Sequence, residues 1–372
     1  MKKKIVNIIG MTLGSVLVAC IILEIILEKM YGVSDPAVKR AIPIRENQPY
    51  TVVTASKDEY YNGIYAVEGV FSGLGDYHAS IDKDGFIEPS KIHDEPEKVL
   101  LFLGGSTTEC ITVDENKRYP YLVGRMLEES SGYKINSYNA GVGGGNSHNS
   151  IDTLLHKGLE VEPDVAVLHH NVNDLIQLLQ WGGYSYTEWG EPLDFYYMQT
   201  AGNVPIGGSV FARLQGTMKQ WFPGIISRIN SLKQTETGYT RVSDYNEEDI
   251  LLKFENNLEM FIAVCEVNGI TPVLMTQASR MNEQPDDLIA QLYEACGGYW
   301  VGIDYNEFYA MWLDMNQVIR DVAEENDIVC IDLANEIGST EGNFYDMVHY
   351  TDEGSEKAAD VIYKELYNII KE

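Results

Sequence analysis

Short apolar runs alternate with helical patterns from residue 99 to the end of the chain. Five of these runs are continuous enough for strands that are covered on both faces of a sheet. They span residues 99–103, 134–138, 164–169, 272–276 and 328–333. Apolar residues at helical spacing predict helices over 120–129, 147–159, 247–268 and 308–325, followed by a last helix from a cap at Thr351 to Ile370. This order predicts an α/β domain with a mainly parallel five-stranded sheet and helices on both faces.

An aromatic-rich segment from about 175 to 245 breaks the alternation. It follows the third predicted strand, is too long for an ordinary connection, and carries many Trp, Tyr and Phe residues among glycines. We predict that this insertion forms a cap over the crevice at the strand ends. Its aromatic residues either form the small core of the cap or offer a surface on which a sugar stacks.

The amino-terminal residues have the pattern of a membrane segment. Residues 2–4 are lysines, and they precede an apolar run from 5 to 27. The run is longer than the apolar part of a cleaved signal peptide, so it predicts a transmembrane signal anchor over 1–30. Because lysines stay on the cytoplasmic side, the rest of the chain is expected outside the cell membrane. Alternatively, residues 17–20 resemble a lipobox in which Cys20 is lipidated, although the apolar residues after Cys20 fit that interpretation poorly.

Residues 31–97 separate the predicted anchor from the α/β pattern. They contain several prolines and tyrosines and show no sustained period. We interpret them as a stalk and an amino-terminal extension that contains strands and packs on the main domain. The main domain then spans 98–372 and includes the insertion.

Composition limits the partners. The 372 residues include 27 Lys and Arg against 56 Asp and Glu, a formal net charge of −29. Nucleic acid is excluded as a partner, because phosphate backbones are bound by clusters of Lys and Arg. The five cysteines show no metal-ligand spacing and are expected to be mostly buried thiols. His169 and His170 are adjacent at a strand end and point to opposite sides, which disfavours a metal site, and we expect no metal and no cofactor.

Three residues have the chemistry of a serine nucleophile and its proton acceptor. Ser106 directly follows the first predicted strand, in the sequence Leu-Gly-Gly-Ser-Thr-Thr, where its amide lies near a helix amino terminus. Asp346 and His349 follow the last strand, and their spacing can place both on one side of a turn. His349 then accepts the Ser106 proton while Asp346 fixes the tautomer of the imidazole. Taken singly, Gly-Gly-Ser is also an ordinary turn, and Asp with His is also a solvated turn with a helix cap.

Two further strand ends carry hydrogen-bond donors. Gly144 lies in a glycine-rich segment after the second strand, where a backbone amide can approach a ligand closely. Asn173 follows the third strand and offers a side-chain amide. Together with the amide of Ser106 they predict an oxyanion hole. Alternatively, Gly144 belongs to a flexible turn and Asn173 caps a loop.

In this order the residues resemble the four sequence blocks of the SGNH hydrolases, the superfamily of GDSL esterases and lipases. The closest match is the segment 345–354, Tyr-Asp-Met-Val-His-Tyr-Thr-Asp-Glu-Gly, and the resemblance covers about 99–370 apart from the insertion. It implies a flavodoxin-like three-layer α/β/α fold. By analogy the catalytic residues are Ser106, Asp346 and His349, and the oxyanion donors are Ser106, Gly144 and Asn173.

The sequence departs from the family pattern in two places. The first block is Gly-Gly-Ser-Thr-Thr rather than Gly-Asp-Ser-Leu, and Asn171 stands where the third block, Gly-x-Asn-Asp, has its glycine. Neither change removes a reacting group. The second is expected to alter the shape of the crevice beside Asn173.

The resulting hypothesis is a membrane-anchored extracytoplasmic serine esterase that works through an acyl-enzyme. Location and family analogy suggest an O-acetyl or other ester on a cell-surface or extracellular glycan as the substrate. An O-acyltransferase and a lipid-ester hydrolase with the same triad are alternatives. The remaining alternative is a catalytically silent glycan-binding or assembly protein.

Overall fold

The computed structural model describes residues 45–184 and 245–371. The predicted anchor over 1–30, the possible lipidation site at Cys20 and most of the predicted insertion lie outside these residues. Within the two described ranges, no helix has the length and apolar character needed to cross a membrane.

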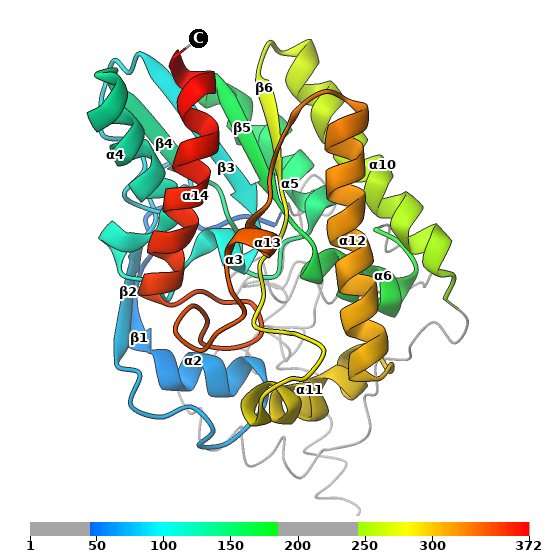
Figure 1. Ribbon diagram of the computed structural model, residues 1–372. Helices are drawn as coiled ribbons and strands as arrows, with labels where there is room; N and C mark the ends of the chain where they lie inside the picture. The colour runs from blue at the N-terminus through cyan, green and yellow to red at the C-terminus, as the bar shows by residue number, and fades with distance from the viewer. Residues whose placement is uncertain (1–44, 185–244, 372) are drawn as a thin grey trace, which may run out of the picture. The chain divides into compact units, whose positions relative to one another are not determined.

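The core of the fold is a five-stranded parallel sheet. Its strands are β3 (Lys98–Gly104), β4 (Ile135–Asn139), β5 (Val165–His169), β6 (Thr271–Met275) and β7 (Val329–Ile331). They lie in the order β4-β3-β5-β6-β7, which is the flavodoxin-like order in which the second strand precedes the first (Figure 1). The predicted α/β architecture with five parallel strands is therefore confirmed. The last strand is shorter than predicted, because Asp332 already caps the short helix α13 (Leu333–Glu336).

Helices cover both faces of the sheet, as the alternation predicted. Leu100 and Phe102 of β3 face a core shared with α4 (Tyr119–Ser131) and α14 (Asp352–Lys371). Leu101 and Leu103 face the opposite core, because successive strand residues point to opposite faces. The helices that contribute to this second core are α5 (Ser147–Thr153), α6 (Val172–Trp181), α10 (Glu247–Val267), α11 (Asp287–Trp300) and α12 (Tyr305–Glu325).

The cap of α14 agrees with the prediction, whereas the helix that begins at Ser147 differs from it. Thr351 caps α14 as expected, since its Oγ1 accepts a hydrogen bond of 3.0 Å from the Gly354 amide. The predicted helix over 147–159 is α-helical only to Thr153 and continues as a wider π turn to Gly158. Gly158 packs so tightly on β3 that a Cβ there would lie 2.9 Å from Leu101 Cδ2.

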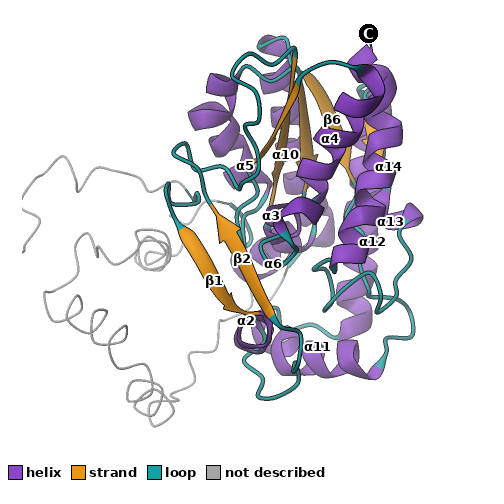
Figure 2. Cartoon of the chain, turned by 90° about the vertical axis from the view of Figure 1, so that its left-hand side faces the viewer, coloured by secondary structure: helices purple, strands orange, loops and turns teal. Residues whose placement is uncertain are grey.

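The amino-terminal extension forms a separate two-stranded sheet at the carboxyl end of the main sheet (Figures 1 and 2). Strands β1 (Val52–Ser56) and β2 (Asp76–Ser80) pair antiparallel, and α2 (Lys57–Ile64) follows β1. Ser56 caps α2 by accepting a hydrogen bond from the Glu59 amide. The extension packs on the main domain through Tyr61, whose hydroxyl lies 2.7 Å from Thr112 Oγ1.

The predicted insertion shares its first residues with α6. Leu175, Leu178 and Leu179 are fully buried in the second core, so this part of the chain belongs to the α/β domain. Four cysteines lie in the described ranges, and all are free thiols, of which only Cys330 is partly exposed.

Candidate active site

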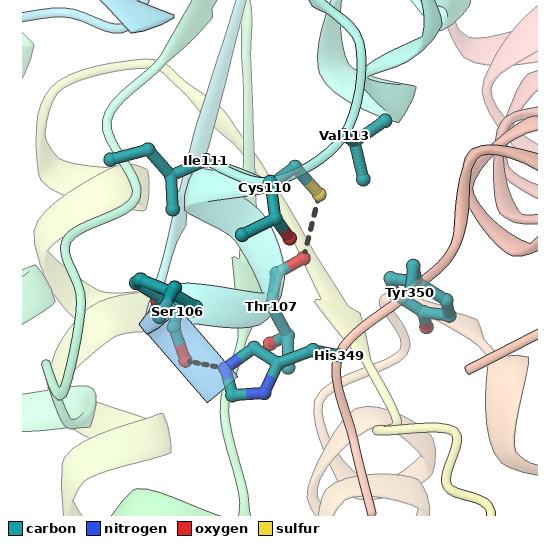
Figure 3. A pocket seen from close by; sticks show the side chains of 9 residues that line it. Ser106, Thr107, Cys110, Ile111, Val113, His349 and Tyr350 are labelled. Atoms are coloured by element: carbon teal, nitrogen blue, oxygen red, sulfur yellow. Dashed lines mark hydrogen bonds between the residues drawn. The ribbon is translucent and has the colours of Figure 1, made fainter. Parts of the chain in front are cut away.

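Loops at the carboxyl ends of the strands bring Ser106, His349 and Asp346 together. Ser106 Oγ donates a hydrogen bond of 2.8 Å to His349 Nε2, as Figure 3 shows. His349 Nδ1 donates a hydrogen bond of 2.6 Å to Asp346 Oδ2. The donor and acceptor assignment follows from Asp346, because an ionised carboxylate only accepts. The geometry is that of a nucleophile, a base and a residue that orients the base.

Ser106 is positioned by the two glycines before it. β3 ends at Gly104, Gly105 is the cap of the one-turn helix α3 (Ser106–Glu109), and Ser106 begins that helix. A Cβ on Gly104 would lie 2.0 Å from Thr108 Oγ1, and a Cβ on Gly105 would lie 2.6 Å from Asn173 Nδ2. The backbone at Gly105 therefore approaches Asn173 too closely for a side chain.

The carboxylate of Asp346 is fully buried and accepts several hydrogen bonds. Its Oδ1 accepts from the Val348 and His349 amides at 2.9 and 2.8 Å, and its Oδ2 accepts from the imidazole. Burial opposes ionisation of Asp346, but His349 and the two amides outweigh it and lower the pKa of this carboxyl. Burial likewise opposes the charged form of His349, but Asp346 and Glu109 raise its pKa above the usual value. The pair is thus arranged to stabilise an imidazolium.

The three amide donors predicted for the oxyanion hole lie in the loops that follow β3, β4 and β5. Among the described residues, the amides of Ser106 and Gly144 have no acceptor, which leaves both for a ligand. Gly144 has φ of +67°, a backbone conformation that favours glycine, and a Cβ there would displace the end of the Arg45 side chain, from which it would lie 2.8 Å. Asn173 Nδ2 donates one hydrogen bond of 2.7 Å to Gly145 O, and its second N–H remains. The structure thus brings Ser106, Asp346 and His349 together, and Asn173 lies beside Gly105 and bonds the carbonyl of Gly145, the residue after Gly144. The roles of Gly144 and Asn173 as oxyanion donors stay predictions.

Asn171, the second departure from the family pattern, is fully buried directly before α6. Its φ of −170° is extended backbone that needs no glycine. Its side-chain amide donates a hydrogen bond of 2.9 Å to Trp312 O on α12. The asparagine is thus accommodated within the domain, and its expected effect on the shape of the crevice beside Asn173 stays a prediction.

A buried carboxylate ties the Gly144 loop to the Asn173 loop. Asp174 accepts hydrogen bonds from the amide and the hydroxyl of Ser147, and from the Tyr184 hydroxyl at 2.6 Å. Burial raises the pKa of Asp174 to about 6 despite these bonds. Since Ser147 begins α5 and Asp174 lies in the first turn of α6, this contact fixes the separation of the two oxyanion loops.

His169 and His170 are buried and make hydrogen bonds to different groups on opposite sides of the end of β5. His169 Nδ1 lies 3.2 Å from the hydroxyl oxygens of Thr108 and Tyr119, and His170 Nε2 lies 2.7 Å from Ser150 Oγ. Burial lowers the pKa of each histidine to about 3. In the described ranges no group of His, Cys, Asp and Glu has the geometry of a metal site.

Sequence reasoning missed the contribution of the amino-terminal extension. The rings of Tyr60 and Tyr61 pack edge-on to His349, with centroids 6.4 and 5.9 Å from the imidazole. Burial raises the pKa of Tyr65, and the neighbouring charge of Asp346 adds to this shift. On the other side of the site, Arg45 donates a hydrogen bond of 2.5 Å to Gly144 O. The extension therefore supports both the catalytic pair and the glycine-rich loop.

Glu109 is a second residue that the sequence did not reveal. It lies one turn after Ser106, is buried, and lies close to the Gly143 backbone, where an added Cβ would be 3.0 Å from Glu109 Oε2. Burial raises the pKa of Glu109 to about 7, although the Gly143 amide and the neighbouring His349 oppose the shift. The only signal in the sequence is an acidic residue in the first turn of the serine helix.

This arrangement can cleave an ester. As Ser106 Oγ bonds to the carbonyl carbon, its proton passes to His349 Nε2, and the three amides stabilise the negative charge that develops on the carbonyl oxygen. His349 then gives the proton to the leaving alcohol oxygen. A water molecule that loses its proton to His349 releases the acid and restores the Ser106 hydroxyl.

Replacing Asn173 with alanine tests the side-chain donor. We expect kcat for an activated ester to fall by about 10²–10³, the usual cost of one oxyanion donor, with a smaller change in KM. Steady-state kinetics with p-nitrophenyl acetate measure both constants. Asn268→Ala, at the end of α10 and at the opposite edge of the sheet, serves as the control and should retain wild-type kcat. An unchanged kcat in Asn173→Ala would exclude the side chain from the oxyanion hole.

Replacing Glu109 with glutamine tests its influence on the base. The Glu109 charge helps to raise the pKa of His349, and only neutral His349 accepts the Ser106 proton. Removing the charge lowers the pKa of His349, so the acidic limb of the kcat/KM profile should move to lower pH. Profiles of wild type, Glu109→Gln and the exposed control Glu129→Gln measure the shift. An acidic limb that stays in place in Glu109→Gln would contradict this coupling.

The fold and the site define a serine hydrolase on a parallel α/β sheet. Residues 102–357 match the GDSL-like Lipase/Acylhydrolase family, and the chain belongs to this family. It is an SGNH-type serine esterase, as the sequence blocks predicted. No curated protein matched the sequence.

Several solved structures are similar to this chain. An acetyl xylan esterase variant from Geobacillus stearothermophilus has 14% identity and a TM-score of 0.43, over 73% of this chain and 95% of that one. The acetyl xylan esterase AlAXEase has 17% identity and a TM-score of 0.42, over 72% and 98%. The lipase/acylhydrolase from Enterococcus faecalis has 14% identity and a TM-score of 0.42, over 73% and 96%.

Proposed function

We propose that this esterase removes O-acetyl groups from a cell-surface or extracellular glycan through an acyl-enzyme on Ser106. His349 is the general base and then the general acid, and Asp346 orients it. The amides of Ser106 and Gly144 and the side chain of Asn173 form the oxyanion hole. The observation that carries the reaction is the continuous hydrogen-bond chain from Ser106 Oγ through His349 to Asp346.

The proposed location rests on the amino-terminal sequence. Three lysines followed by the apolar run 5–27 favour a single-pass anchor with the catalytic domain outside the membrane. In that location an esterase meets glycans of the cell surface, which supports the choice of substrate. Cell fractionation, followed by protease treatment of intact cells, tests this part of the proposal. Recovery of the full chain with the cytosol, protected from external protease, would contradict it.

Probe labelling and product analysis test the activity. A fluorophosphonate probe labels only an activated serine, so we expect the full chain in detergent to be labelled and Ser106→Ala to remain unlabelled. The labelled enzyme should have lost its ability to release acetate from O-acetylated oligosaccharides. Absence of labelling would indicate a silent site. Labelling without acetate release from any O-acetylated oligosaccharide would reject the glycan substrate, and acetyl transfer to an added oligosaccharide at the expense of free acetate would identify a transferase.

A further inference from the structure

The proposed oxyanion donor Gly144 lies in a β-turn made largely of glycine. The Gly145 amide donates a hydrogen bond of 2.8 Å to Val142 O, which closes the turn over 142–145. Of its two central residues, Gly144 has φ of +67°, whereas the φ of Gly143 is not positive. A positive φ at the second central residue alone is the mark of a type II turn.

The glycines do not by themselves select this turn type. Types I and II share the closing hydrogen bond, and they differ mainly in the peptide between the two central residues, which is rotated by about 150° or more from one type to the other. Glycine adopts both conformations at little steric cost. In the type I form the Gly144 N–H would point to the opposite side of the turn. Contacts from outside the turn therefore decide how much of each form is populated.

The guanidinium of Arg45 lies against one face of this turn. Its Nη1 donates a hydrogen bond of 2.5 Å to Gly144 O. Its Nη2, Cζ and Nη1 lie 2.8, 3.1 and 3.1 Å from the position that a Cβ on Gly144 would occupy. At positive φ that position is on the same side as the carbonyl oxygen of the preceding residue, which is the clash that disfavours L side chains there. The guanidinium thus stands on the side of the Gly143 carbonyl.

This placement gives the middle peptide a preferred direction. The N–H and C=O of a trans peptide point in opposite directions, so the Gly144 N–H points away from Arg45. In the type I form the N–H would instead face the guanidinium, which has only donors. A cation is stabilised at the carbonyl end of a peptide dipole and destabilised at the N–H end. Arg45 therefore stabilises the type II form relative to type I.

Further contacts place the turn between the extension and the nucleophile. Asn47 Nδ2 donates a hydrogen bond of 2.8 Å to Gly141 O, directly before the turn. A Cβ on Gly105, the residue before the nucleophile, would lie 3.0 Å from Gly145 O, so the turn is adjacent to the serine. Neither contact involves the middle peptide, in contrast to the Arg45 guanidinium, which lies on its carbonyl side.

We propose that Arg45 is a positioning residue for catalysis, which holds the 142–145 turn in the form that directs the Gly144 N–H into the oxyanion hole. This inference rests on the proposed function, in which that N–H stabilises the negative charge on the carbonyl oxygen. Arg45 precedes residue 102, where the family match begins. Part of the organisation of the oxyanion hole is therefore supplied by the chain's own amino-terminal extension.

Kinetics of Arg45 variants of the full-length protein in detergent test the proposal. Arg45→Ala is expected to lower kcat for p-nitrophenyl acetate by about 10- to 100-fold and to change KM by less than about threefold, because a turn that is in the type II form only part of the time loses a corresponding share of the rate. Arg45→Lys keeps the charge and a donor for Gly144 O, so its kcat should lie between those of Arg45→Ala and wild type. Lys83→Ala removes an exposed positive charge from the same extension and should keep the wild-type kcat.

A trifluoromethyl ketone separates a loss of oxyanion stabilisation from a general loss of structure. Ser106 Oγ bonds to its carbonyl carbon, the serine proton passes to His349, and the carbonyl oxygen takes the negative charge in a stable tetrahedral adduct. Its Ki should therefore rise in Arg45→Ala by about the factor by which kcat/KM falls. Arg45→Met keeps the apolar stem without charge or donors and should behave in the same way. It carries the test if Arg45→Ala has a lowered melting temperature.

The outcomes separate this inference from the proposed function. Wild-type kcat in Arg45→Ala and Arg45→Met would overturn the inference, as would a raised KM at unchanged kcat, which would make Arg45 a substrate-binding residue. A fall in kcat without a rise in Ki for the ketone would also overturn it. A wild-type protein that hydrolyses no ester and is not labelled by the fluorophosphonate probe would overturn the proposed function, and the inference with it.

Discussion

Ser106→Ala is expected to lower kcat for p-nitrophenyl acetate by about 10⁴–10⁶ and to abolish fluorophosphonate labelling. The change removes the atom that forms the acyl-enzyme, and the oxyanion donors alone retain only a small part of the rate enhancement. Because the Ser106 side chain is partly exposed and sits between two supported loops, the melting temperature should change little. Steady-state kinetics, labelling and thermal unfolding measure the three quantities.

The matched control for this variant is Ser130→Ala. Ser130 lies at the carboxyl end of α4. This helix runs from the carboxyl ends of the strands, where the active site lies, toward their amino ends. Its kcat and labelling should equal those of wild type. Wild-type turnover by Ser106→Ala would remove this serine from the mechanism.

Asp346→Asn is expected to lower kcat by about 10⁴ while leaving the fold intact. The two backbone amides at Asp346 Oδ1 dictate how an asparagine is oriented there, because its carbonyl oxygen has to replace Oδ1 as the acceptor. Its NH₂ group then faces His349 Nδ1 in place of Oδ2. The imidazole turns to the tautomer in which Nδ1 accepts and Nε2 carries the proton. In that tautomer His349 cannot take the proton of Ser106.

Kinetics together with NMR of the histidine ring protons measure this effect. The signal of the Nδ1 proton that bonds Asp346 should disappear in Asp346→Asn. Asp360→Asn, an exposed position on α14, controls for the loss of one negative charge and should retain wild-type kcat. A fully active Asp346→Asn protein would show that the carboxylate does not orient the base.

The sheet and the reacting groups could be predicted because each leaves a signal within a short stretch of sequence. Each strand is a short apolar run, and β3 carries the clearest one, since Leu100 to Leu103 are all buried. Ser106 and Asn173 follow β3 and β5 within two to four residues. The topology of a parallel sheet is therefore enough to bring both residues to the carboxyl ends of the strands. The three-residue spacing of Asp346 and His349 likewise needs no knowledge of the rest of the chain.

Contacts between distant segments were not predictable in this way. Tyr61 lies 51 residues from Thr112, to which it is bonded, and the extension shows no sustained period that would announce a packed helix. Glu109 has the character of an exposed residue in a short helix, and its burial depends on the loop at Gly143. Gly105 had the pattern of a turn, and its real constraint, the approach of Asn173, appears only in three dimensions.

The position of the extension affects where this enzyme can be cut. The family similarity begins at residue 102, but residues 45–80 supply side chains that contact Gly144 and His349. A fragment that starts at residue 102 would lack Tyr61 and Phe71, which belong to the buried core. It would also leave His349 without the two tyrosine rings that pack on it. The smallest complete enzyme is therefore longer at its amino end than the homologous domain, and a truncation for crystallisation or expression has to keep residue 45 onward.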